Sequence, residues 1–392
     1  MRSGMLLADA ERLLVLSDVH LNHNGSRSTG AALAALAQRS PGAELVLAGD
    51  VFDLSREPPE HDPAESIAGL LRHHQQVREA FRAHLSAGHR ITLIAGNHDA
   101  ALADARVRDG ILAALDVQEG ARLEVYPWFV RRGGVHIEHG HMYDPDNAPS
   151  HPLALWSCAT EPLGIALTRR FLAPSGALKL AHAHETTPLA GLWRAYELFG
   201  ARAPLVVAQY FGTAIRLCVE AGRQHDVAAE VASGESALPR YAELTGVPAT
   251  VLAELVRAGA EPTHHRFSDT FMRLYFDRVV ATLSFLFGAS TLAFRRSPVA
   301  AAVAAVSGMY LGASVKRGTS RYSGVIEQRL RDAAGFVSNT TGAALVIFGH
   351  THREEESPSY MNSGTFGYAR SGARPYIWLE RGSAPQRRHF TA

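Results

Sequence analysis

The sequence predicts an α/β fold that is interrupted by a long, mainly helical insertion. Residues 1–148 alternate apolar, strand-like runs with Ala- and Leu-rich helical segments. Residues 149–339 lack that alternation and are rich in Ala and Leu, whereas the strand-like pattern returns in residues 340–392. A chain of 392 residues can bury a sizeable core. We therefore expect one domain built from the first and third segments, with the second segment inserted between them.

The spacing of the apolar residues predicts the individual strands and helices. "RLLVLSDVH" is a short buried strand ending at Ser17, "TGAALAALAQR" is a helix, and "AELVLAGD" is a second strand. Residues 64–86 have helical spacing, and "HRITLIAGNHD" is the third strand. After the insertion, "GAALVIFGHTH", "PSYMNSG" and "RPYIWLE" are strand-like. Continuous apolar strands joined by helices favour a sheet covered on both faces, which collects functional residues at the carboxyl ends of its strands.

Composition limits the classes of function. The formal net charge of +1 gives no support for a nucleic-acid-binding surface. Two cysteines are too few for a disulfide framework and fit a reducing compartment. Asp9, Glu11 and Arg12 interrupt the N-terminus before any long apolar stretch, so a secretory signal is not expected. The cytoplasm is the expected location.

Polar clusters rich in histidine follow the apolar runs. They are "SDVH", "GDVFD", "GNHD", "HIEHGHMYD" and "FGHTH". Any one of them could be an ordinary turn or helix cap. Together they offer carboxylate, amide and imidazole donors without a thiolate, which is the ligand chemistry of Mn, Fe or Zn. Glycines 49, 96, 140 and 349 adjoin the candidate ligands, where a small residue lets the backbone approach the site.

In this order the clusters resemble those of the calcineurin-like metallophosphoesterase superfamily. The resemblance covers residues 13–145 and 343–366. It implies a four-layer α/β/β/α sandwich that holds two divalent or trivalent ions of Mn, Fe or Zn. It assigns Asp18, His20 and His352 to one ion, Asn97, His139 and His350 to the other, and Asp50 to both. The implied reaction is in-line attack on phosphorus by a hydroxide that bridges the metals.

Five further residues have expected roles near the metals. His98 would be the general acid at the leaving oxygen, and Asp99 would orient its imidazole and raise its pKa. Asp53 is either an acceptor for a ligand histidine or a ligand itself. His141 either contacts substrate or supports a metal ligand. Asn362, in "NSGT", either shapes the floor of the pocket near the substrate or belongs to a plain turn.

Two uncharged stretches lie in the insertion, at 279–294 and 298–315. As helices they would be about 24 and about 27 Å long, a little short of a hydrocarbon core of about 30 Å. A crossing would also carry Arg295 and Arg296 to the far side, against the positive-inside tendency. Two alternatives remain, namely a buried hairpin packed through Gly308 and Gly312, and an apolar cap that dips into one leaflet.

The expected activity is hydrolysis of phosphate ester or pyrophosphate bonds in a phosphorylated small molecule or a lipid-linked substrate. The helical insertion and "HGHMYD" are similar to features of the UDP-2,3-diacylglucosamine hydrolases. Residues 279–315 would then make peripheral contact with the inner face of the cytoplasmic membrane. The alternatives are a scaffold of the same fold without metals, and a metal-dependent nuclease. A scaffold should lack ligands, and a nuclease should carry a basic groove with stacking aromatics.

Overall fold

The computed structural model divides the chain into two compact units. It describes residues 7, 12–57, 61–118, 120–157, 160–178, 188–221, 226–316, 324–369 and 372–391. Unit 1 comprises residues 1–165, 225–262 and 326–392, and unit 2 comprises residues 166–224 and 263–325. The units are described separately below.

The first sheet of unit 1 is built around four parallel strands. Its strands, in spatial order, are β11 (Gln386–Phe390), β10 (Arg374–Glu380), β1 (Arg12–Leu16), β2 (Glu44–Ala48), β3 (Ile91–Ile94) and β4 (Leu123–Tyr126). β1, β2, β3 and β4 are parallel, whereas β10 pairs antiparallel with β1. The carboxyl ends of β1, β2 and β3 therefore lie together at one edge, as the sequence predicts.

The second sheet combines strands from the two ends of unit 1. In spatial order they are β5 (Phe129–Arg132), β6 (Val135–Glu138), β7 (Leu345–Phe348), β9 (Tyr360–Ser363) and β8 (Glu354–Glu356). β7 lies parallel to β6, in the register Ile137 to Ile347. This pairing places the end of β7 next to the end of β6, although more than 200 residues separate them in the sequence.

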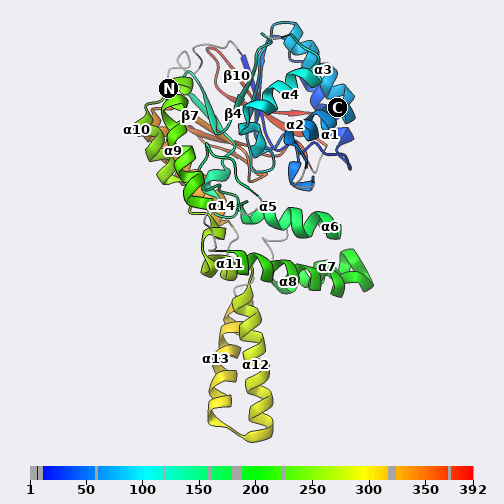
Figure 1. Cartoon of the computed structure of the whole chain (residues 1–392), viewed down its shortest axis with the longest axis vertical. Helices are drawn as coiled ribbons and strands as arrows, with labels where there is room; N and C mark the ends of the chain where they lie inside the picture. The colour runs from blue at the N-terminus through cyan, green and yellow to red at the C-terminus, as the bar shows by residue number, and fades with distance from the viewer. Residues whose placement is uncertain are drawn as a thin grey trace. The chain divides into compact units, whose positions relative to one another are not determined.

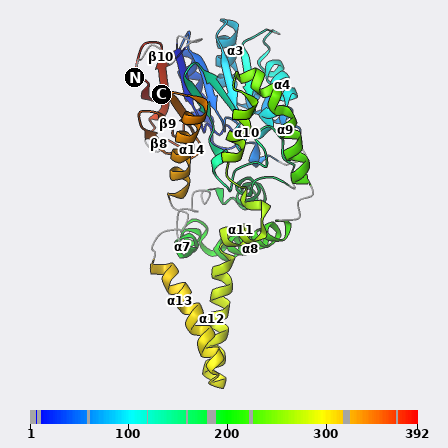
Figure 2. The same cartoon turned by 90° about the vertical axis from the view of Figure 1, so that its left-hand side faces the viewer.

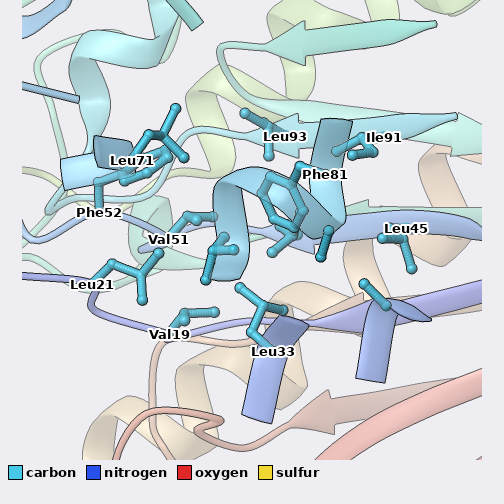
Figure 3. Close-up of a cluster of buried hydrophobic side chains, with 14 of the residues drawn as sticks. Val19, Leu21, Leu33, Leu45, Val51, Phe52, Leu71, Phe81, Ile91 and Leu93 are labelled. Carbon is cyan, nitrogen blue, oxygen red and sulfur yellow. The ribbon is translucent and has the colours of Figure 1, made fainter. Parts of the chain in front are cut away.

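Four layers follow from which side chains pack together. The first layer consists of α1 (Arg27–Gln38), α2 (Pro63–His73), α3 (Gln75–Ser86) and α4 (Ala105–Leu115), whose apolar residues meet Leu14 and Leu16 of β1. Figure 3 shows part of this core. Leu13 and Val15 face the other way and pack with the second sheet. That sheet is covered in turn by α9 (Asp226–Thr245), α10 (Ala249–Ala258) and α14 (Val325–Thr341) (Figure 1). The predicted α/β/β/α sandwich is confirmed.

Unit 2 is helical in the part of the chain that the structure describes. Its helices are a π-helical turn (Thr168–Leu172), α6 (Ala173–Ser175), α7 (Pro188–Phe199), α8 (Ala203–Glu220), α11 (Phe267–Arg273), α12 (Phe276–Arg295) and α13 (Pro298–Lys316). α5 (Leu163–Leu167) lies where the chain passes from one unit to the other. A small core forms around Phe171, Ala177 and Val206.

Two sequence-based boundaries differ from the structure. Residues 64–86 form two helices, because the chain leaves the helical conformation at His74. The buried His74 ring is held there by the carbonyl oxygen of Asn22, 2.9 Å from Nε2. The predicted insertion is also divided. Residues 226–262 and 326–339 belong to unit 1, because α9, α10 and α14 bury their apolar faces on the second sheet.

The apolar hairpin of α12 and α13 is not buried, so that prediction is wrong for the isolated chain. In each helix, only 6% of the most apolar 18-residue segment is buried. The two helices lie side by side in both views (Figures 1 and 2). Gly288 makes the closest approach, since a Cβ there would lie 2.8 Å from the backbone nitrogen of Ala304. Gly308 packs on Phe285, whereas Gly312 has no described atom within 4 Å.

A buried histidine on unit 1 predicts a loss of stability in acid. Burial lowers the pKa of His151 to about 4, and its Nδ1 accepts a hydrogen bond from the backbone N–H of Leu153 at 3.1 Å. The folded state thus favours the neutral ring, so this stabilisation is complete above the unfolded pKa of about 6.5 and is lost as the pH falls toward 4. We expect the loss to reach about 1–2 kcal/mol, because water screens part of the penalty.

Urea unfolding of the wild type and of His151→Gln at pH 7.5 and pH 4.5 measures this effect. Gln keeps an acceptor for Leu153 but cannot take up a proton, so the variant should lose less stability in acid than the wild type. His61→Gln, at an exposed position, is the matched control and should follow the wild type. Equal acid losses in the wild type and His151→Gln would contradict the assignment.

Candidate metal centre

The candidate ligands lie on the turns that follow β1, β2, β3, β6 and β7. Five of the seven have left-handed backbone conformations, a region that side chains with a Cβ rarely adopt. They are Asp18 (φ 54°), His20 (φ 53°), Asp50 (φ 54°), His350 (φ 69°) and His352 (φ 57°). Such strain persists only where the surrounding structure enforces it, and it clusters at functional sites. The strained turns therefore mark this edge of the two sheets as a site.

Glycines let these turns approach one another. A Cβ on Gly96 would lie 2.2 Å from Asp50 Oδ1, and one on Gly49 would lie 2.4 Å from the ring of His139. A Cβ on Gly349 would similarly meet the side chain of Ser17 at 2.2 Å. The prediction that small residues permit close backbone approach at the site is confirmed at these three positions.

One group of ligands comes from the turns after β1 and β7. His352 Nε2 lies 3.0 Å from Asp18 Oδ1, and His20 Nε2 lies 3.3 Å from His352 Nε2. Asp18 and His20 are buried, whereas His352 is partly exposed. The three side chains together form a group that could hold a metal ion.

The second group comes from the turns after β2, β3, β6 and β7. His139 Nε2 lies 3.1 Å from Asn97 Oδ1 and 3.3 Å from Asp50 Oδ2. The ring of His350 is 5.2 Å from that of His139, centroid to centroid. Asp50 Oδ2 also lies 3.8 Å from His20 Nε2. One carboxylate oxygen therefore faces histidines of both groups.

Hydrogen bonds behind the site fix which atoms face inward. Asp50 Oδ1 accepts from the backbone N–H of His98 at 2.8 Å, which leaves Oδ2 for the site. His139 Nδ1 donates to the carbonyl of Ala48 at 3.0 Å, so that Nε2 carries the lone pair. The Asn97 amide donates through Nδ2 to Asn147 Oδ1 at 3.2 Å, which directs its oxygen toward His139.

These side chains fit a cationic group. Asp18 Oδ1 is buried and faces His352 Nε2, and the Nε2 atoms of His352 and His20 face each other beside it. Burial disfavours a charge on His139, yet Asp50 and Asp18 raise its pKa to about 10. Burial and the nearby His98 lower the pKa of His20 to about 3, which leaves it neutral, as a metal ligand must be. The cluster thus offers negative charge and lone pairs to a cation.

The comparison with protein families agrees with this geometry. The family model of the calcineurin-like phosphoesterases matches residues 11–202. The chain belongs to the calcineurin-like metallophosphoesterase superfamily, a family of hydrolases that act on phosphoric esters. A comparison with curated proteins gives no significant match. The matched residues end before His350 and His352, so the parallel pairing of β6 and β7 is what brings these two histidines into the metallophosphoesterase site.

His98 of this metallophosphoesterase is held by Asp53. His98 Nδ1 lies 2.9 Å from Asp53 Oδ1, and Ser55 Oγ donates to the same oxygen at 2.7 Å. Arg56 pairs with the other oxygen of Asp53. Asp53 therefore positions His98, and with His20 and His98 it also forms a group that could hold a metal ion. Both predicted alternatives for Asp53, an acceptor for a histidine and a ligand, are compatible with this geometry.

The predicted role of Asp99 is wrong in one part, since Asp99 contributes to the raised pKa of His98 but does not orient its ring. Asp99 Oδ2 accepts from the backbone N–H groups of Val51 (2.7 Å) and Phe52 (3.1 Å), and Oδ1 accepts from those of Gly96 (2.8 Å) and Asp50 (3.1 Å). A fully buried carboxylate with four backbone donors fixes the turn that carries Asp50 and cannot also orient His98. Because His98 and Asp99 are adjacent in sequence, the motif predicts that their side chains interact. In the structure the backbone directs the two side chains apart.

The electrostatic surroundings keep His98 protonated. Burial opposes a charge on the ring, but Asp50 and Asp53 outweigh it and raise the pKa of His98 to about 9. Cations bound at the site would offset the charge of Asp50. The carboxylate of Asp53 would still act on His98, because it is separately hydrogen-bonded to the ring. A proton donor at neutral pH therefore lies beside the candidate ligands.

Asn362 and His141 are both buried. Asn362 Nδ2 donates to the carbonyl of Gly349 at 2.7 Å, and its Oδ1 accepts from the N–H of Gly364 at 3.0 Å. Its side chain is fully enclosed, so Asn362 supports the turn before His350, which fits the second of the two predicted alternatives. His141 lies 5.4 Å from the ring of His139, and burial together with His139 lowers its pKa well below the usual value.

Sequence reasoning missed three residues of the site. Asp144 Oδ2 lies 2.9 Å from His350 Nε2, and Asn147 Nδ2 donates to that same oxygen at 2.7 Å. Tyr368 lies with its ring 5.1 Å from that of His20 and accepts a hydrogen bond from Arg56 at 3.1 Å. Asp144 and Asn147 follow "HGH" by a few residues. Their closeness to His139 in sequence is the signal that could have identified them. Tyr368 gave no such signal.

Asp144 predicts a measurable contribution to metal affinity. The Asp144 carboxylate is as close to His350 Nε2 as the candidate ligands are to one another. It could therefore bind the same ion as His350 or orient the His350 ring. Asp144→Asn should weaken binding of the more loosely held ion by about 10- to 100-fold. Titration of the metal-stripped protein, followed by calorimetry, measures this. Asp146→Asn, two residues away and partly exposed, should bind metal as the wild type does, and equal affinities in the two variants would contradict the prediction.

Proposed function

We propose that the protein is a binuclear metal-dependent hydrolase of phosphate ester or pyrophosphate bonds. The observation that carries this proposal is the position of Asp50, whose Oδ2 lies 3.8 Å from His20 Nε2 and 3.3 Å from His139 Nε2. A single carboxylate oxygen between two histidine groups is suited to two adjacent cations. Asp18, His20 and His352 would hold one ion, Asn97, His139 and His350 the other, and Asp50 both.

The chain's own residues divide the remaining work. When bound, Mn, Fe or Zn ions would neutralise the phosphoryl oxygens and lower the pKa of water. Asn97 supplies a neutral oxygen, so the site repels an incoming phosphate less than a further carboxylate would. His98 gives its Nε2 proton to the leaving oxygen, since Nδ1 is engaged by Asp53. The leaving group then departs as a neutral alcohol or a protonated phosphate.

The proposed substrate is a nucleotide-linked or lipid-linked phosphate, hydrolysed on the cytoplasmic side of a membrane. The apolar surface of α12 and α13 supports a lipid environment for the protein. Tyr368, with 42% of its surface exposed beside His20, offers an aromatic face to an organic group next to the phosphate. Both features favour an amphiphilic substrate over inorganic polyphosphate.

A panel of substrates on the metal-reconstituted protein tests the proposal. The panel contains bis-p-nitrophenyl phosphate, nucleotide pyrophosphates, UDP-2,3-diacylglucosamine and single-stranded DNA, each with Mn²⁺, Zn²⁺ or Fe²⁺, and Asp50→Asn is the blank. We expect metal-dependent release of product from at least one of the first three. Failure of every metal to support hydrolysis would favour the scaffold alternative. Preferred cleavage of DNA would favour the nuclease, and rapid cleavage of generic diesters with UDP-2,3-diacylglucosamine left intact would remove the lipid-linked substrate.

A further inference from the structure

We propose that α12 and α13 form a hairpin that crosses a lipid bilayer, with both of its ends on the cytoplasmic side. This goes beyond peripheral contact and does not depend on the chemistry of the metal centre. The starting observation is exposure. Among the described residues, α12 and α13 are the helices long and apolar enough to cross a membrane, and they pack on little besides each other.

The apolar surface extends around the whole hairpin. Large exposed side chains are Val280 (52%), Leu283 (61%), Leu286 (55%), Phe287 (72%), Phe294 (89%), Val299 (71%), Val306 (62%), Met309 (67%) and Val315 (60%). A helix that lies flat on a membrane needs one polar face, but α13 carries apolar residues on all sides. A helix that is apolar all round is typical of a protein core or a membrane span, and this one is not in a core.

Length and charge favour crossing over a shallow dip. The helices contain 20 and 19 residues, about 30 and about 28 Å, so they can reach across a hydrocarbon core of about 30 Å with their charged ends, which include Arg278, Arg295 and Lys316, at its borders. Arg295 and Arg296 form the tip of the hairpin, and both are exposed. A hairpin that entered only one leaflet would leave two guanidinium groups near the centre of the bilayer, which is strongly unfavourable. A complete crossing places them among the headgroups of the far leaflet.

The contact between the two helices suits a membrane. It is made by Gly288 against Ala300 and Ala304, where a Cβ on the glycine would come within 2.9 Å of both backbones. Small residues that let helices approach closely are the usual basis of helix pairing in lipid, where apolar burial from water contributes nothing. Near the base, the Tyr310 hydroxyl donates to Asp277, so this acidic group is hydrogen-bonded.

The charges on either side of the hairpin set its orientation. At the base of the hairpin, Arg266 and Arg273 precede α12, Arg278 lies in its first turn, Lys316 ends α13, and Arg317 and Arg321 follow in the sequence. At the tip there are two basic residues, Arg295 and Arg296. The side with more Lys and Arg in short flanks stays in the cytoplasm. Trp193 and Tyr196 are also exposed on α7 of the same unit, with 65% and 59% of their surfaces accessible, and these residue types are enriched at membrane interfaces.

The test combines extraction with thiol labelling of the full chain in a bacterial host. The background carries Cys158→Ala and Cys218→Ala, to which Ser297→Cys at the tip or Ser268→Cys on exposed α11 is added. We expect the protein to stay in the membrane pellet after carbonate extraction. An impermeant maleimide should label Ser297→Cys in intact spheroplasts, and should label Ser268→Cys only after lysis. Cleavage of bis-p-nitrophenyl phosphate, or metal content, reports that each variant is folded.

Four results would overturn the proposal. Recovery in the soluble fraction, as monomers or as oligomers that cover the hairpin, would show that the hairpin does not enter a membrane. Release by carbonate would reduce the hairpin to a peripheral contact. Protection of Ser297→Cys in spheroplasts, with the protein still in the pellet, would indicate insertion into one leaflet. Labelling of Ser268→Cys in intact spheroplasts would contradict the orientation. A chain that hydrolyses nothing but remains in the pellet would leave the anchor standing and contradict only the proposed activity.

Discussion

Asp50→Asn is expected to abolish hydrolysis and to remove at least one of the two metal ions. The substitution keeps the size of the side chain and can keep the hydrogen bond from His98 N–H to Oδ1, 2.8 Å long in the wild type. It removes the negative charge from the one oxygen that faces both His20 and His139. Because both ions depend on that oxygen, we expect kcat/KM to fall on the order of 10³-fold or more.

Metal analysis and kinetics on the same preparation separate the causes of this loss. The metal content of Asp50→Asn should fall from about two ions per chain to one or fewer. The matched control is Glu44→Gln, which alters another buried carboxylate, one at the start of β2, at the opposite end of that strand from Asp50, and paired with Arg132 of β5. The control should lose stability but retain both ions per folded molecule. Two ions and near-normal activity in Asp50→Asn would contradict the bridging role.

The fold could be predicted largely because its apolar periods are local. The strands around Leu14, Val46 and Leu93 are continuous apolar runs, and their shared edge follows from parallel pairing. The division of the insertion could not be predicted, because helices such as α9 and α14 look alike in sequence whether they cover a sheet or stand apart. What distinguishes them is the partner they pack on, and that partner is far away in the chain.

The site shows the same limit at the level of single residues. The types and the order of the ligands could be predicted from the sequence, since each ligand lies directly after a strand. Roles that depend on the direction of a side chain could not be predicted. Asp99 is adjacent to His98 in sequence, but its oxygens turn toward four backbone N–H groups, whereas Asp53, 45 residues earlier, reaches the His98 ring. Asn362 likewise lies near a strand end, within β9, and its amide is hydrogen-bonded to the backbone of Gly349 and Gly364 and to the Tyr360 hydroxyl.

Asp53 and Asp99 have different roles, and this difference underlies the second large expected effect, the loss of activity in His98→Ala. His98→Ala removes the proposed proton donor and should lower kcat by about 10²- to 10⁴-fold for substrates with poor leaving groups. Asp53→Asn should lower it by about 10- to 100-fold, since the ring loses its charged partner while the donor itself remains. Neither change removes a proposed metal ligand, so both variants should keep two ions.

A double-mutant cycle decides whether Asp53 acts through His98. If it does, His98→Ala with Asp53→Asn should be no slower than His98→Ala alone, because the second change has nothing left to orient. Substrates with an activated leaving group such as p-nitrophenolate need no proton donor and should be cleaved at nearly wild-type rates by both single variants. Asp99→Asn is the contrasting case. It should lower the midpoint of thermal unfolding, because the buried turn from Asp50 to Phe52 loses an oxygen that accepts backbone hydrogen bonds, and its rate loss should not depend on the leaving group. If Asp99→Asn instead reproduced the leaving-group dependence of His98→Ala while Asp53→Asn did not, the two carboxylates would have to exchange roles.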